Sequence, residues 1–119
     1  MFKIAIPVLH VSSSAAAEEF YCRQLGFRRD YAYRPFGGLD PCYMGLSRDD
    51  ARVHVSSFSG DAVPGGVVYL LVDDVNAMHA ELVAKGLAVG SPIDQDWGNR
   101  EMYVMDPDAN SIRFTQHLD

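Results

Sequence analysis

Hydrophobic and polar positions in the first half of the chain follow the order typical of a strand, a helix and three more strands. Residues 3–11 are dominated by isoleucine, valine, leucine and alanine, which predicts a buried strand. One of the serines at 12–14 is expected to cap a helix, and Gly26 to end it. Three further strands are predicted at residues 27–34, 41–47 and 51–58. The first half therefore predicts the order βαβββ.

The second half repeats this order. An apolar run begins at Val67, residues 73–76 (Asp-Asp-Val-Asn) supply a helix cap, and Gly86 follows the helical pattern. Strands are then predicted at residues 87–91, 100–105 and 110–116. With a shift of about sixty residues, segment 6–13 falls on 67–74 and segment 44–57 falls on 103–116.

This repetition predicts an α+β fold of two tandem βαβββ modules, whose curved sheets form a cleft. The length suits one domain over residues 1–119, since each half alone would be marginal. The expected parts are module one (1–58), a glycine-rich linker (59–66) and module two (67–119). No Lys-Ser/Thr follows the glycines of the linker, so it is not a phosphate-binding loop.

The chain is acidic, with a formal net charge of −6, and its basic residues are scattered. This pattern argues against nucleic-acid binding and favours encounter with cationic ligands. No apolar run is long enough to span a bilayer, and no signal-peptide core precedes the first strand, so the cytosol is the expected location. Cys22 and Cys42 suit reduced thiols rather than a disulfide framework.

Sequence patterns for catalysis are lacking. The four histidines are isolated, and His54 suits the core or a cavity wall better than a catalytic role. No nucleophile-elbow pattern accompanies the serines. Aromatic residues offer a better lead, because Tyr31, Tyr33 and Phe36 follow the first helix closely. The only tryptophan, Trp97, lies in a polar, turn-like segment. Flat rings at such positions can stack on planar ligands and attract cations.

Four short motifs occur in combination. They are Ile6-Pro-Val-Leu-His-Val, Phe20-Tyr21 followed by Leu25-Gly26-Phe27, Trp97-Gly98-Asn-Arg100-Glu101, and Asp106-Pro-Asp-Ala-Asn110. From Ile6 to Gln116 the chain resembles the vicinal oxygen chelate superfamily, and within it the bleomycin resistance proteins. The resemblance implies a homodimer with exchanged strands or arms and two ligand grooves at its interface. Ala109 stands where the family more often has glycine, and a positive φ there would cost about 1 kcal/mol.

In the superfamily's metalloenzymes, four side chains, two from each half, hold a divalent ion. The positions that resemble them in this chain are Ile6, His54, Val67 and Arg113. Isoleucine and valine have no lone pair, and protonated arginine repels a cation, so only His54 could coordinate a metal. A one-residue shift in strand register would turn other residues inward. If the strands do not shift in this way, the resemblance implies no metal, no other cofactor and no metal-dependent glyoxalase, dioxygenase or transferase activity.

The resemblance implies a binding protein that sequesters a cationic, planar antibiotic of the bleomycin class without changing it. The expected ligand-binding residues are Asp30, Tyr31, Phe36, His54, Trp97 and Gly98. Three of the rings would stack on the ligand, Gly98 would allow close backbone approach, and acids such as Asp30 and Asp96 would favour its positive charge. Two alternatives remain open at this point. One is an enzyme of the same fold acting on a small metabolite, and the other is a binder of another planar natural product.

Overall fold

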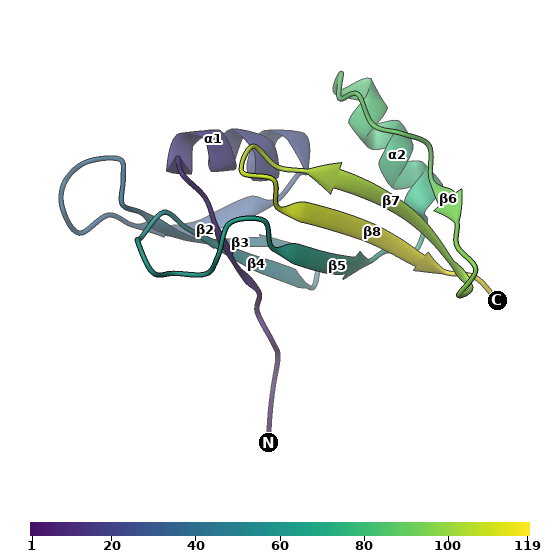
Figure 1. Ribbon diagram of the computed structural model, residues 1–119, viewed down its shortest axis with the longest axis horizontal. Coiled ribbons are helices and arrows are strands. Elements are labelled where there is room, and N and C mark those ends of the chain that lie inside the picture. Colours follow the sequence, from purple (N-terminus) through teal and green to yellow (C-terminus); the bar gives the residue numbers. More distant parts are fainter.

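The computed structural model describes residues 1–119 and contains two four-stranded sheets, with helices on the same side of both (Figure 1). The first sheet has the order β1 (Val8–His10), β4 (Ala51–Ser56), β3 (Tyr43–Arg48), β2 (Arg28–Tyr33). The second has the order β5 (Val67–Leu71), β8 (Ser111–His117), β7 (Asn99–Met105), β6 (Ile93–Asp94). Helix α1 (Ser14–Glu18) continues as the π-helical segment η1 (Glu19–Gln24), and α2 is Val75–Ala84. The predicted α+β fold with two βαβββ modules is confirmed.

Both predicted helix caps are confirmed. The hydroxyl of Ser13 accepts a hydrogen bond from the amide of Ala16 at 3.1 Å, and the carboxylate of Asp74 accepts one from the amide of Ala77 at 3.0 Å. Each bond satisfies a backbone N–H that the first helical turn leaves without a partner. Neither helix has the length and apolar character required to cross a bilayer.

Strand register supports the internal repeat. In the first sheet Val8 of β1 pairs in parallel with His54 of β4, and in the second Tyr69 of β5 pairs in parallel with Arg113 of β8. These two pairs occupy equivalent places under the alignment of the halves. The predicted equivalence of His54 and Arg113 is therefore confirmed.

The third strand of each module departs from the predicted alignment by one residue. Gly45 pairs with His54, whereas Tyr103 pairs with Arg113, so Gly45 and not Met44 is the structural counterpart of Tyr103. The turn that joins β7 to β8 is longer than the turn between β3 and β4, and this difference shifts the hairpin register. Met44 consequently faces the core, and Tyr103 faces outward.

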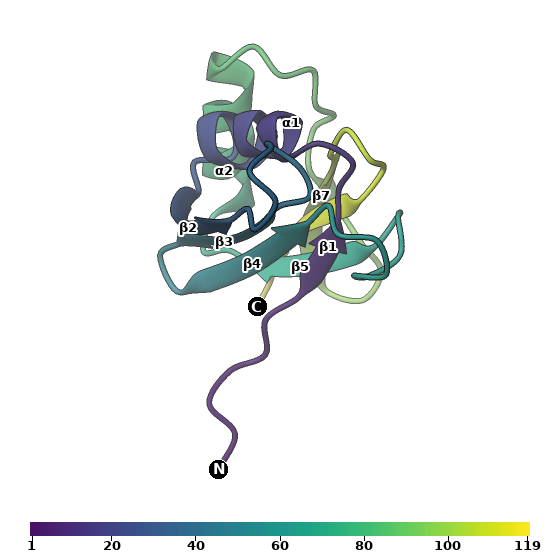
Figure 2. The ribbon, with the colours of Figure 1, turned by 90° about the vertical axis from the view of Figure 1, so that its left-hand side faces the viewer.

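Two predicted strands differ from the structure. Only Val8–His10 of the expected strand 3–11 pairs in the sheet, and the residues before it extend away from the body (Figure 2). Pro7 has no amide hydrogen to donate, although its carbonyl accepts from the amide of His54 at 2.9 Å. The expected strand at 87–91 is also wrong, because Leu87 and Val89 pack on the core and the edge strand forms later, at Ile93–Asp94.

Each sheet buries the face that the helices cover. Twenty buried apolar side chains from both modules form one continuous core, which includes Tyr21, Leu25, Met44, Leu82 and Ile112. Alternate residues along the strands point to the opposite face, which no element of the chain covers (Figure 1). The fold therefore presents two broad sheet surfaces that carry exposed side chains.

A buried polar network joins the two modules. The carboxylate of Asp106 accepts hydrogen bonds from the hydroxyl of Tyr21 at 2.7 Å and from the side-chain amide of Asn110 at 2.8 Å. That amide also donates to the carbonyl of His10, and the side-chain oxygen of Asn110 accepts from the amide of Gly66. Burial and this carboxylate raise the pKa of Tyr21, so its hydroxyl remains a donor. The Asp106-to-Asn110 motif thus connects β8 to module one.

Ala109 completes the turn of this motif with a φ of 64°. The positive φ considered from the sequence is therefore confirmed. An alanine in this left-handed region costs about 1 kcal/mol, because its Cβ crowds the following carbonyl. The buried hydrogen bonds on either side hold the turn in place despite that local strain.

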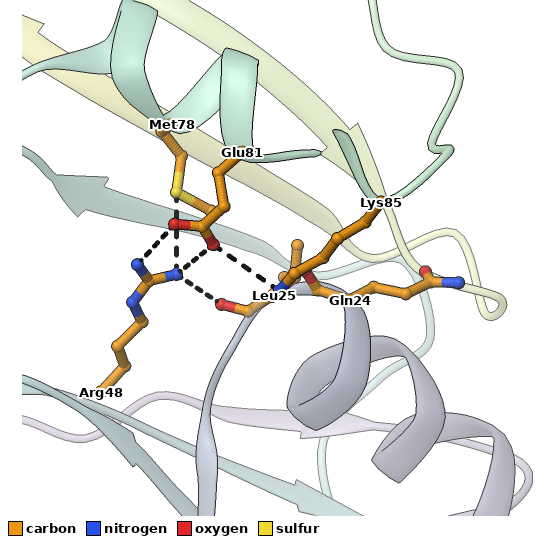
Figure 3. A network of polar contacts seen from close by, with 6 residues as sticks. All are labelled: Gln24, Leu25, Arg48, Met78, Glu81 and Lys85. Atoms are coloured by element: carbon orange, nitrogen blue, oxygen red, sulfur yellow. Dashed lines mark hydrogen bonds and ion pairs between the residues drawn. The ribbon is translucent and has the colours of Figure 1, made fainter. Parts of the chain in front are cut away.

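An ion pair provides a second connection between the modules (Figure 3). Both terminal nitrogens of Arg48, at the end of β3, donate to Glu81 of α2 at 2.8 Å. One of them also donates to the carbonyl of Leu25 at 2.8 Å, and Lys85 donates to the carbonyl of Gln24 at 3.0 Å. The hydrogen bonds from Arg48 lower the pKa of Glu81. This contact is therefore present at neutral pH and is lost as the pH falls through that lowered value.

Candidate functional site

Three aromatic side chains cluster on the open face of the first sheet. The rings of Tyr31 and Tyr43 are nearly parallel, with centroids 6.5 Å apart. His54 meets both rings edge-on, at centroid distances of 5.9 and 5.3 Å. Tyr31 remains about half exposed. The predicted ligand contacts Tyr31 and His54 are therefore neighbours, and Tyr43 joins them.

Gly45 allows this cluster to form. It pairs with Tyr31 in the neighbouring strand, and the Tyr31 ring lies directly over its Cα. A Cβ at position 45 would stand 2.8 Å from Cζ of Tyr31, which is well inside van der Waals contact. Sequence reasoning missed both Tyr43 and Gly45. The available signal was their alternation with the buried residues Met44 and Leu46, which predicts a shared outward face.

His54 presents a neutral imidazole on this face. Its Nδ1 lies 2.8 Å from the hydroxyl of Tyr43. Burial lowers the pKa of His54, and Arg52 lowers it further against the opposite effect of Asp30. Burial and nearby groups raise the pKa of Tyr43, so its hydroxyl stays protonated and can donate to Nδ1. In the tautomer that accepts this bond, the ring proton of His54 is on Nε2, where it can donate to an acceptor on a ligand.

The residues at the superfamily's metal-ligand positions do not suit a metal. Ile6 precedes β1 and Val67 lies on β5, and neither side chain has a donor atom. Arg113 packs its guanidinium against tyrosine rings. Nowhere in residues 1–119 do three His, Cys, Asp or Glu side chains gather closely enough to hold a metal ion.

The open face of the second sheet is organised around Glu101, which is buried at its base. The carboxylate accepts four hydrogen bonds, the shortest of them from the hydroxyl of Tyr103 at 2.7 Å. The others come from Trp97 Nε1 at 3.3 Å and, at 3.4 Å each, from Asn99 and Thr115. Burial alone would raise the pKa of Glu101, but these four donors lower it overall. Glu101 therefore anchors the exposed Trp97 ring at the sheet, a role that the sequence did not reveal.

The bond between Glu101 and Tyr103 predicts an unusual tyrosine titration. It raises the pKa of Tyr103 to about 12. A raised folded-state pKa means that this contribution to stability is complete below about pH 10 and is lost as the pH rises through 12. Absorbance titration should show a step near 12 that Tyr103→Phe removes. Glu101→Gln should move that step toward lower pH, and an unmoved step would contradict the assignment.

Asp30 lies in a β-bulge between Arg29 and Tyr31. Its carboxylate accepts from Nε of Arg28 at 2.8 Å, and hydrogen bonds from Ser47 and Arg28 lower its pKa. The predicted attraction of Asp30 for a cationic ligand is therefore weakened, because Arg28 already neutralises its charge.

Phe36 and Gly98 lie in loops at different ends of the molecule. Phe36 is exposed and approaches Phe58, with ring centroids 6.5 Å apart, rather than Tyr31. Gly98 follows Trp97 with a φ of 89°, a conformation that favours glycine. Its carbonyl accepts from the amide of Leu118 at 2.9 Å. These contacts set the path of the turn that carries Trp97.

A single chain does not bring all the predicted ligand contacts together. Tyr31 and His54 lie on the first sheet, and Trp97 lies beside the second with no aromatic neighbour in stacking contact. Two hollows, of about 450 and 470 Å³, lie elsewhere, one between η1 and β7 and the other beside the β3–β4 turn and α2. Each chain therefore offers two partial sites on open sheet faces.

Comparison with known proteins assigns the fold to a family. The family described as "Glyoxalase superfamily protein" matches residues 1–119. The chain belongs to the glyoxalase superfamily. The predicted resemblance to the vicinal oxygen chelate proteins and their bleomycin resistance branch is confirmed by this match and by solved structures. No curated protein matches the chain in a sequence comparison.

Several solved structures are similar to nearly the whole chain. TnmS3, an antibiotic binding protein from Streptomyces sp. CB03234, is 25% identical with a TM-score of 0.78, covering 98% of this chain and 97% of its own. The bleomycin-binding protein of Streptomyces verticillus, complexed with copper(II)-bleomycin, is 27% identical with a TM-score of 0.72 and the same coverage. A bleomycin resistance determinant encoded on the transposon Tn5 is 23% identical, with a TM-score of 0.78 and 98% coverage of both chains.

Proposed function

We propose that this glyoxalase superfamily protein binds a planar aromatic antibiotic of the bleomycin class and sequesters it without changing it chemically. The observation that carries the proposal is that exposed rings are held in place on both open faces. The ring of Tyr31 packs closely against the backbone of Gly45. The indole nitrogen of Trp97 donates a hydrogen bond to the buried carboxylate of Glu101. Rings fixed before binding lose little conformational entropy when a ligand stacks on them.

The similar solved structures support this proposal, since two of them are named for antibiotic or bleomycin binding. Sequestration breaks no bond, and protection follows from mass action when the protein is abundant and binds the drug tightly. The acidic net charge of −6 would assist the approach of a cationic drug in the cytosol, where we place the protein.

The proposal includes a homodimer in which arms or strands are exchanged. Residues 1–7 leave the body on the side away from the helices (Figures 1 and 2), and Met1, Phe2 and Ile4 are exposed. A two-fold assembly would cover these apolar side chains. It would also bring Tyr31 of one protomer toward Trp97 of its partner and form two equivalent grooves. Sedimentation equilibrium should give twice the mass of one chain, and removal of residues 1–6 should weaken the dimer.

Titration with bleomycin tests the function directly. Chelator-treated protein should bind one bleomycin per chain with submicromolar affinity in calorimetry, and the drug should quench Trp97 fluorescence. Trp97→Ala should lower this affinity by about tenfold or more, because the largest stacking surface is lost. Trp97→Phe, the control, should retain most of the affinity since it keeps a ring.

Unchanged affinity in Trp97→Ala would remove Trp97 from the site. Failure of the wild-type protein to bind bleomycin would discard that drug as the ligand. The similarity to TnmS3 favours a second candidate in that event, another planar antibiotic held by the same rings. Stacking tolerates different ring systems, so the same titration would then be repeated with other planar natural products.

A further inference from the structure

Arg113 lies at the centre of a row of three side chains on the open face of the second sheet. Tyr69 of β5 and Tyr103 of β7 pair with it on either side. Its guanidinium carbon is 4.5 Å from the ring centre of Tyr103 and 5.8 Å from that of Tyr69. A planar guanidinium that stacks on rings keeps its N–H edges available for donation. The two tyrosine rings therefore hold the guanidinium of Arg113 in position and leave its N–H groups free to donate.

Unlike most arginines of the chain, Arg113 has no carboxylate partner. Five others form ion pairs with Asp or Glu, namely Arg23, Arg28, Arg29, Arg48 and Arg100. The side chain of Arg113 makes only a long hydrogen bond, from Nε to the hydroxyl of Ser111 at 3.5 Å. Its two terminal nitrogens therefore have no acceptor within the chain.

The surroundings of Arg113 leave its charge unbalanced. The adjacent outward-facing positions on the three strands are occupied by Val67, Leu71, Met105, Ser111, Thr115 and Glu101. Glu101 is the only carboxylate among them, and four side-chain donors already engage it. An oriented cation beside exposed rings, with no counter-ion, is suited to an anionic acceptor from outside the chain.

We propose that Arg113 recognises an anionic oxygen group, such as a carboxylate, sulfonate or phenolate, carried next to the planar rings of the ligand. The inference rests on the proposed function, since it specifies the chemical class of the molecule that stacks in the same groove. Two oxygens of one group can accept from both terminal nitrogens of the guanidinium at once. A positive charge elsewhere on the ligand remains compatible with the acidic net charge of the protein.

Three matched probes test this inference. Acridine-9-carboxylate, acridine-9-methanol and acridine-9-methylammonium share one planar ring system and differ in charge. Calorimetry on the wild-type protein at low ionic strength should show the carboxylate binding at least about tenfold more tightly than the alcohol, and the ammonium binding most weakly. Arg113→Gln should abolish the preference for the carboxylate and change the affinity for the alcohol less than about threefold.

A control variant and the neutral probe separate the possible outcomes. Arg23→Gln alters the net charge by the same amount at an exposed helical site, and should keep the full preference. Arg113→Lys keeps the charge without the stacked plane and should fall between wild type and Arg113→Gln. Equal binding of carboxylate and alcohol by the wild type would overturn the anion site and leave aromatic binding standing. No binding of any acridine would contradict the aromatic groove itself, and the inference with it.

Discussion

Asp106→Ala is expected to lower the free energy of unfolding by about 3 kcal/mol, because it leaves several buried donors without an acceptor. The hydroxyl of Tyr21 and the backbone amides of Asp108 and Asn110 all donate to this carboxylate. Tyr21 and Asn110 are completely buried, so water cannot replace the lost bonds without opening the core. Urea denaturation followed by circular dichroism would measure the change.

Asp108→Ala is the matched control, since it removes a carboxylate two residues away in the same turn. Asp108 accepts a single hydrogen bond, from the exposed amide of Ser12 at 3.1 Å. Loss of such a bond should cost less than about 1 kcal/mol. If the two variants unfolded at the same urea concentration, the buried Asp106 network would contribute no more to stability than the exposed contact of Asp108.

Gly45→Ala should reduce the affinity for bleomycin by about tenfold and destabilise the fold by about 2 kcal/mol. The added methyl group would occupy the space of the Tyr31 ring, which lies over the glycine. Tyr31 is at the sheet surface, so its ring can swing into solvent and leave its place beside Tyr43. Calorimetric titration with bleomycin and urea denaturation would measure the two effects.

A double-mutant cycle makes this prediction specific. In a Tyr31→Ala background there is no ring to displace, so adding Gly45→Ala should change neither affinity nor stability by more than about 0.5 kcal/mol. Gly90→Ala is the control for a general effect of the substitution, since nothing lies within 4 Å of the position that its Cβ would occupy. A full loss of affinity from Gly45→Ala in the Tyr31→Ala background would show that Gly45 acts through another residue.

Much of the fold could be predicted because it depends on short-range chemistry. Ser13 and Asp74 cap helices through their own neighbours, and alternation along the strands separates buried Met44 from outward Tyr43. The strand at 87–91 failed because an apolar segment of that length can pack on a core without pairing. The one-residue offset between Met44 and Tyr103 also escaped prediction, since hairpin register depends on turn geometry.

For the candidate site, the sequence indicated the separate residues but not their partners. It singled out Tyr31 and Trp97 as aromatic candidates and His54 as a residue of the core or a cavity wall. It could not show that Trp97 donates a hydrogen bond to Glu101. A carboxylate in a strand is expected to be exposed to solvent unless the donors around it are known. The stacking of Arg113 between two tyrosines likewise arises only from the pairing of three strands.

The two βαβββ modules and the helix caps follow from the sequence alone, because they depend on side-chain chemistry and local periodicity. Which side chains share a face, and with them the contacts of Gly45, Glu101 and Arg113, became visible in the folded structure. Such contacts join residues from separate strands, and their positions depend on register and on the packing of the whole core.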